Sequence, residues 1–237
     1  MGTTTALTRH LNVVVDKTDD AFVIKVNNRT MKTPKNKVLQ VPNESLALAI
    51  ANERRSNKKM SNMHLTALAF TAIDNPFDET KEDMANALIE YLKFDTVRFR
   101  DTENEELLRL QSRHWDPLIG WFEHTFDCHL PIEYGDLSNV GTLPQTTSDK
   151  LSRHLQSHSG RWPLVGINFM TRNLKSFVLT SCLTERFLKV ERAVEMARLE
   201  TKFQTEKWSK VEWEHDIDEQ TTNVRVAAGA LFYHLSV

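Results

Sequence analysis

Two histidines at helical spacing are among the few side chains of this 237-residue chain that suggest metal chemistry. His154 and His158 lie four residues apart in a polar stretch, which places both imidazoles on one face of a helix, where they can clamp a metal ion. A second candidate cluster surrounds the end of another expected helix. Its members are Glu123, His124, Cys128 and His129. Neither group completes a ligand set at a standard spacing, so a solvated helix face and a helix end entering a loop are the simpler interpretations.

Motifs that usually carry catalysis or nucleotide binding do not occur in the chain. Its seven glycines form neither the dinucleotide-binding pattern nor the P-loop, and there is no nucleophile elbow or HExxH motif. Asp95 and Asp116 are better explained as helix caps than as a catalytic pair. Arg54, Arg55 and the lysines at 58 and 59 form a small basic patch, for which a solvated loop is the simpler interpretation. We expect no cofactor and no enzymatic activity.

One carboxylate interrupts an apolar pattern. Residues 184–209 are rich in good helix formers and predict a single long helix, capped by Thr184, whose buried face changes partway along. Glu200 falls inside its apolar sector, where a carboxylate is costly to bury without a partner. Two interpretations stay open. Glu200 pairs with an internal Arg, or it is held at the edge of a contact surface for a partner's Arg or backbone N–H groups.

The composition is that of a globular protein, with 40% hydrophobic and 26% charged residues. A formal net charge of -2 argues against a nucleic-acid binder that neutralises phosphates. Two cysteines, Cys128 and Cys182, make a disulfide framework unexpected, and no apolar run approaches the roughly 20 residues that span a bilayer. The first ten residues lack an apolar signal core and are too short for a full organelle presequence, so we expect either a removed presequence or a bacterial origin.

The first part of the chain predicts strands followed by helices. Val-rich and Ile-rich runs at 11–16 and 21–26 predict two strands, and Asn27-Asn28 suits a tight hairpin turn. Further strands are expected at 30–33 and 38–41, then helices at 44–56 and 63–74. Strands that precede helices without alternating with them favour an α+β domain, which we place at residues 8–78.

The remainder, residues 79–237, predicts an all-α helical bundle. Thr80 and Asp83 resemble a capping box, and Asp116-Pro117 is expected to restart a helix. A buried central helix is expected at 162–183. In the last helix the small residues 227–230 would let another helix pack closely. The fold class is therefore α+β, with a small N-terminal β-sheet and helix domain before an all-α C-terminal domain.

Several motifs occur together and in order along the chain. They are Asn28-Arg29 with Lys32-Thr33-Pro34, the helix Pro42–Glu53, MxxTxLAxTAID at 63–74, Asp95-Thr96 with Arg98, QxxxWDPLxxW at 111–121, and Leu199-Glu200 with Gln204, Trp208 and His215-Asp216. With this set, from about Asn12 to Leu235, the chain resembles the assembly chaperones that bind the unassembled alpha subunit of the F-type ATP synthase catalytic head. Four positions depart from the family pattern: Met31 replaces a usual Leu, Arg54 a usual Trp, Asn57 a usual Gln, and Ser209 a usual Gly.

The resemblance implies a protein-binding function without nucleotide hydrolysis. The expected partner is the alpha subunit, with no nucleic acid and no membrane span, and we expect a monomer in the mitochondrial matrix or in the cytoplasm of a bacterium. Our hypothesis makes Glu200 the polar anchor of the partner site. The other expected partner-binding residues are Leu199, Phe203, Gln204 and Trp208. The alternatives are a metal-dependent enzyme using His, Cys and Glu ligands, which metal analysis would reveal, and a general adaptor for another partner.

Overall fold

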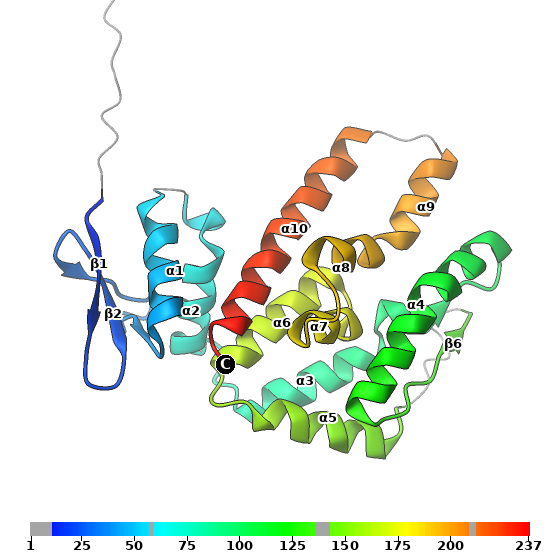
Figure 1. Ribbon diagram of the computed structural model, residues 1–237, viewed down its shortest axis with the longest axis horizontal. Coiled ribbons are helices and arrows are strands. Elements are labelled where there is room, and N and C mark those ends of the chain that lie inside the picture. Colours follow the sequence, from blue (N-terminus) through cyan, green and yellow to red (C-terminus); the bar gives the residue numbers. More distant parts are fainter. Residues whose placement is uncertain (1–10, 57–58, 136–142, 209–211) are drawn as a thin grey trace, which may run out of the picture. The chain divides into compact units, whose positions relative to one another are not determined.

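A computed structural model describes residues 11–56, 59–135, 143–208 and 212–237 (Figure 1). For Glu206, Trp208 and residues 212–216 it describes the backbone alone. The chain divides into two compact units, the first ending at Pro76 and the second extending from Phe77 to Leu235. Each unit is described here by itself.

The first unit begins with a small antiparallel sheet. Strand β1 (Val13–Lys17) pairs with β2 (Phe22–Val26), with Val15 opposite Ile24. Asn27 and Asn28 both have positive φ (50° and 65°), the conformation of a tight hairpin turn, and lead into β3 (Arg29–Thr30). Strand β4 (Gln40–Val41) pairs with the other end of β2. The predicted hairpin and its asparagine turn are confirmed.

Two helices complete this unit, α1 (Glu44–Arg55) and, after the short 3-10 helix η1 (Met60–Asn62), α2 (His64–Asp74). The Asn43 side chain caps α1 by accepting a hydrogen bond from the Leu46 N–H at 2.9 Å. The core is fully buried and draws on sheet and helices alike, because each element has one apolar face. Its members include Ile24, Leu39, Leu46, Ile50 and Ala69.

Buried polar contacts hold these pieces together. Glu53 near the end of α1 accepts hydrogen bonds from the N–H groups of Leu65 and Thr66 at 3.0 and 2.8 Å, and so caps α2 from a distance. Thr33 donates its hydroxyl to Asp74 at 2.6 Å, which fastens the loop after β3 to the end of α2. Four positions that carried the family resemblance therefore have structural roles in this unit.

The second unit is helical, apart from one short parallel pairing between β5 (Phe99–Arg100) and β6 (Glu133–Tyr134). Helix α6 contacts α3, α7, α8 and α10 and is the centre of the bundle (Figure 1). The helices are α3 (Lys81–Lys93), η2 (Thr96–Arg98), α4 (Glu105–Phe126), α5 (Gln145–Ser157), α6 (Trp162–Leu174), α7 (Phe177–Thr184), α8 (Val190–Ala197), α9 (Leu199–Trp208) and α10 (Glu212–His234). Thr80 and Asp83 form the predicted capping box at the start of α3.

Three helix boundaries differ from the prediction. The expected helix 162–183 is broken into α6 and α7, because Lys175 has a positive φ of 53° and Ser176 caps α7. The expected helix 184–209 is likewise broken. Arg186 has a positive φ of 57°, and α8 ends at Ala197, with Arg198 as its C-cap, before α9 begins at Leu199. The prediction that a new helix starts at Asp116-Pro117 is also wrong, because α4 continues without a break through Pro117.

Helices α6 and α10 approach closely through glycines, as the small residues 227–230 predicted. A Cβ atom on Gly229 would lie 2.6 Å from Cγ of Met170. A Cβ atom on Gly166, from the other side, would lie 3.2 Å from Cβ of Tyr233. Residues without a Cβ are therefore needed where these two helices cross.

Candidate functional site

Glu200 lies in the first turn of α9 and contacts α4. Its Oε1 accepts a hydrogen bond from Nε2 of Gln111 at 2.6 Å. Gln111 is fully buried, and its own Oε1 accepts from the N–H of Asp101 at 2.8 Å. The carboxylate is thus fixed in orientation by an amide that is itself fixed by the backbone.

Glu200 has no cationic partner within ion-pair distance among the described residues. Burial raises its pKa above the usual range, and the charge of Asp101 adds to this, while the hydrogen bond from Gln111 and the charge of Arg100 act in the opposite direction. Of the two interpretations left open, pairing with an internal Arg is therefore not seen among the described residues, where Arg100 pairs with Asp116 at 2.5 Å. A half-buried carboxylate held by a neutral donor remains able to accept a positive group.

The other predicted partner-binding residues lie on the same helix but differ in exposure. Leu199 is buried and packs inside the unit, so it anchors α9. Phe203 is half-buried, with the ammonium of Lys207 5.1 Å from its ring centre, and Gln204 is exposed. Trp208 is the last residue of α9, and its side chain lies outside the described part of the structure.

Residues of α4 position the corner between α8 and α9. The indole N–H of Trp115, which is fully buried, donates to the carbonyl of Met196 at 3.1 Å. The guanidinium of Arg100 lies 5.3 Å from the centre of the Trp115 ring. Sequence reasoning identified Gln111 and Trp115 only as parts of a motif. A buried amide and a buried indole both need hydrogen-bond partners. This requirement could have indicated that Gln111 and Trp115 bond to another element of the bundle.

Arg198 marks the break between α8 and α9. Its guanidinium binds Asp218 and lies 3.8 Å from Glu219, both on α10. These contacts fix the end of α8 against the last helix. Figure 1 shows α9 at the margin of the second unit, between α8 and the start of α10. The Glu200 carboxylate therefore lies where a peripheral helix joins the bundle.

The two aspartates that were expected to be caps have different roles. Asp95 is fully buried and accepts from the N–H groups of Val97 and Val178 at 3.0 and 2.9 Å, so it caps both η2 and the start of α7, as predicted. Burial raises its pKa to about 6 despite these bonds. Asp116 is not a cap but the ion-pair partner of Arg100, because α4 does not restart there.

The histidine and cysteine positions do not assemble a metal centre in the part of the chain that the structure describes. The rings of His154 and His158 meet edge to face, with centroids 5.5 Å apart, and burial lowers the pKa of both. Glu123 accepts from the N–H of Leu130 at 2.7 Å and contacts the exposed His129. Glu123 thus bonds to the segment that follows α4, and His154 and His158 pack against the rings of Phe126 and Tyr233.

The described residues contain no helix that is long and apolar enough to cross a bilayer. The first unit is a small sheet with two helices, the second is a helical bundle, and no group of metal ligands assembles among the described residues. The sequence profile described as "ATP12 chaperone protein" matches residues 9–123. Over this part of the sequence the chain is similar to the ATP12 chaperone family. This confirms the family resemblance and the expectation that the protein is not an enzyme.

Individual relatives agree with this assignment. The mitochondrial protein atp12 of Schizosaccharomyces pombe is 28% identical in an alignment of 220 positions that covers 88% of this chain and 76% of that protein. The crystal structure of Atp12 from Paracoccus denitrificans superposes with a TM-score of 0.83 at 25% identity, covering 95% of this chain and 96% of that one. A structure from Agrobacterium tumefaciens, at 20% identity, shares the fold with a TM-score of 0.86 and covers 94% of this chain and 84% of that one. The predicted α+β fold is confirmed.

Proposed function

We propose that this protein binds the unassembled alpha subunit of F-type ATP synthase, covers the surface of alpha that later faces beta, and releases alpha to beta during assembly. The observation that carries the proposal is similarity to this chaperone family, supported by ordered motifs along nearly the whole chain and by the shared fold with Atp12. The relatives come from a mitochondrial and a bacterial system, so we propose the matrix or a bacterial cytoplasm as the location.

Shielding is the physical task that such a client requires. A lone subunit exposes the apolar surface that it would bury against its neighbours, and large exposed apolar patches promote aggregation. The chaperone must also give way to beta, so its contact cannot be as strong as the final interface. A monomeric chaperone that needs no nucleotide for release satisfies both conditions by competition alone.

We propose α9 as the contact element and Glu200 as its polar anchor. The half-buried carboxylate is held by Gln111 and has no described cationic partner, so an Arg or a backbone N–H from the client would offset the cost of its burial. Phe203 and Gln204 lie within the next turn, and Trp208 ends the same helix. Leu199 contributes by holding α9 against the bundle.

The decisive variant is Glu200→Gln, with Glu191→Gln as its matched control. The amide oxygen of the variant can still accept from Gln111, so the fold is expected to remain intact. Glu191 is exposed on neighbouring α8 and makes no hydrogen bond or ion pair to a described residue. Loss of one charge-assisted contact at the client interface predicts about tenfold weaker binding of the alpha subunit.

The assay follows light scattering of alpha diluted from denaturant, with increasing amounts of chaperone. Wild type and Glu191→Gln should suppress aggregation equally, and Glu200→Gln should need about ten times more protein. Equal suppression by all three would remove Glu200 from the site. Failure of the wild type to suppress aggregation would reject the alpha subunit as client.

A further inference from the structure

The first unit contains a pocket, lined in part by residues of the family motifs, that has no role in the contact proposed for α9. It has a volume of about 420 Å³ and lies between the run from β3 to Pro34 on one side and α1, η1 and α2 on the other. The lining residues are Val26, Arg29, Thr30, Met31, Lys32, Thr33, Pro34, Arg54, Met60 and Phe70. We call this the basic pocket.

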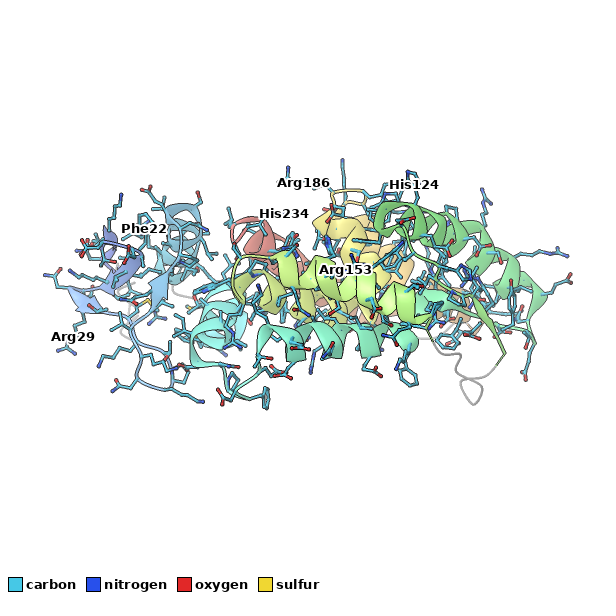
Figure 2. All side chains as sticks on the ribbon, turned by 90° about the horizontal axis from the view of Figure 1, so that it is seen from below. Phe22, Arg29, His124, Arg153, Arg186 and His234 are labelled. Carbon is cyan, nitrogen blue, oxygen red and sulfur yellow. The ribbon has the colours of Figure 1, made fainter. Side chains whose placement is uncertain are left out.

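Three cations border the basic pocket without an acidic partner in the part of the chain that the structure describes. Arg29 at the hairpin tip is exposed (Figure 2), and the ammonium of exposed Lys32 donates only to the neutral Asn36 side chain, at 3.0 Å. Arg54 is half-buried in the last turn of α1. None of the three forms an ion pair with a described residue, and no Asp or Glu is among the lining residues.

Arg54 is the least satisfied of these cations. Its Nη1 lies 3.7 Å from the sulfur of Met63, a weak acceptor, and its Nε–H is buried without any hydrogen-bond partner among the described residues. A buried guanidinium N–H without an acceptor is costly, and a carboxylate is the group that best matches the guanidinium fork. The orphaned donor therefore points to an anionic ligand.

Apart from Thr30 and Thr33, the remaining lining residues of the pocket are apolar. Met60 is about half exposed, and Met31 and Phe70 are partly exposed beside it. A small inorganic anion would satisfy the cations and leave these side chains in water. A ligand that carries both a carboxylate and an apolar side chain would use the whole lining, and a polypeptide segment offers both at neighbouring positions.

Charge along the chain favours an acidic ligand at this unit in particular. Residues 1–76 contain eleven Lys and Arg against six Asp and Glu, whereas residues 77–237 contain nineteen against twenty-six. The near-neutral total thus hides a basic first unit. A basic surface attracts an acidic segment and raises its rate of encounter.

We propose that the basic pocket binds an extended acidic segment of the client polypeptide, as a second contact separate from α9. Carboxylates of the segment pair with Arg54 and Lys32, and an apolar side chain between them packs on Met31, Met60 and Phe70. The client's identity rests on the function proposed above. The chemistry of the segment rests on the pocket alone.

The test measures fluorescence polarisation of overlapping short peptides that cover the alpha subunit, each titrated with the full-length protein. Peptides in which acids flank an apolar residue should bind, and versions with the acids changed to their amides should not. Arg54→Gln and Lys32→Gln should each weaken binding about fivefold, as expected for one partly exposed charge pair. Lys17→Gln, an exposed cation outside the pocket, is the control and should bind like wild type.

Lys32 is exposed, so its variant keeps the test informative even if Arg54→Gln fails to fold. Glu200→Gln should leave peptide binding unchanged. Two results would refute the proposed role of the basic pocket while leaving the proposed function in place. One is capture of intact alpha without binding of any acidic peptide. The other is peptide affinity that is the same in wild type, Arg54→Gln and Lys32→Gln. Failure to capture intact alpha would reject the proposed function, and the assignment of the segment to this client with it.

Discussion

Replacing Gln111 by Met tests whether the amide really secures α9 to α4. Met has a similar length and volume but cannot donate to Glu200 or accept from the Asp101 N–H. Loss of a hydrogen bond to a charged group costs about 1.5–3 kcal/mol, and loss of one between neutral groups about 0.5–1.5 kcal/mol. Burial of the apolar Met side chain offsets part of the free energy lost with the two hydrogen bonds, so we expect a net destabilisation of about 2–3 kcal/mol.

Calorimetry and hydrogen exchange are suited to this variant. For a unit of this size, 1 kcal/mol lowers Tm by about 2–4 °C, so the unfolding transition of Gln111→Met should shift by about 5–10 °C. Amides of α9 should lose protection before those of α6, because the hydrogen bond joins a peripheral helix to the bundle. The control is Glu200→Met combined with Gln111→Met, since removing both partners leaves no unpaired carboxylate. This pair should cost at least about 1 kcal/mol less than the sum of the single variants.

The cost should also depend on pH. The folded-state pKa of Glu200 is already raised by burial, so its ionised form destabilises the fold, and this penalty is relieved as pH falls through that pKa. Gln111 opposes the shift, and its removal raises the pKa further. The stability deficit of Gln111→Met should therefore shrink on acidification. A deficit below about 0.5 kcal/mol, or full additivity in the double variant, would refute the reasoning.

Two further predictions concern the fold. The pKa of Asp95 is raised to about 6, so its contribution to stability is largest below that pH and falls as pH rises through it. Relative to Asp95→Asn, wild type should gain on the order of 1 kcal/mol between about pH 7 and pH 5 in urea unfolding, and a loss in that interval would contradict the assignment. Gly229→Ala places a Cβ 2.6 Å from Met170 and should destabilise the fold by about 1–3 kcal/mol. As its control, Gly120→Ala in α4 meets nothing within 4 Å and should stabilise the fold by about 0.5–1 kcal/mol. Similar Tm shifts for both variants would argue against the close crossing of α6 and α10.

Local patterns predicted much of the fold. Val-rich and Ile-rich runs and the turn-forming Asn27-Asn28 were sufficient for the first hairpin, and the side-chain pattern at Thr80 identified a helix start. Such features depend on residues a few positions apart, which a sequence displays directly.

The breaks in the helices depended on contacts between distant residues. Residues 184–209 are good helix formers, yet Arg186 adopts a left-handed conformation and Arg198 binds acids of α10 about 20 positions away. Likewise, Asp95 caps a helix that begins 82 positions later, at Phe177. Intrinsic propensity is a weak preference that tertiary contacts override.

The candidate site was predicted only in part. The helical pattern singled out Glu200 as an unusual carboxylate, but its donor lies 89 positions away and is a neutral amide, which neither of the two open interpretations named. The basic pocket was missed because its cations come from β3, the following loop and α1, which only the fold brings together. The sequence showed Arg54 as a departure from the family pattern, but it did not indicate that Arg54 lines a pocket.

The most direct measurement of the central claim is light scattering coupled to size-exclusion chromatography of the protein mixed with isolated alpha subunit, before and after addition of beta. The account predicts a one-to-one complex with alpha that forms without nucleotide, and free chaperone once beta is added. Absence of the complex, or a stable assembly that holds chaperone, alpha and beta together, would contradict it.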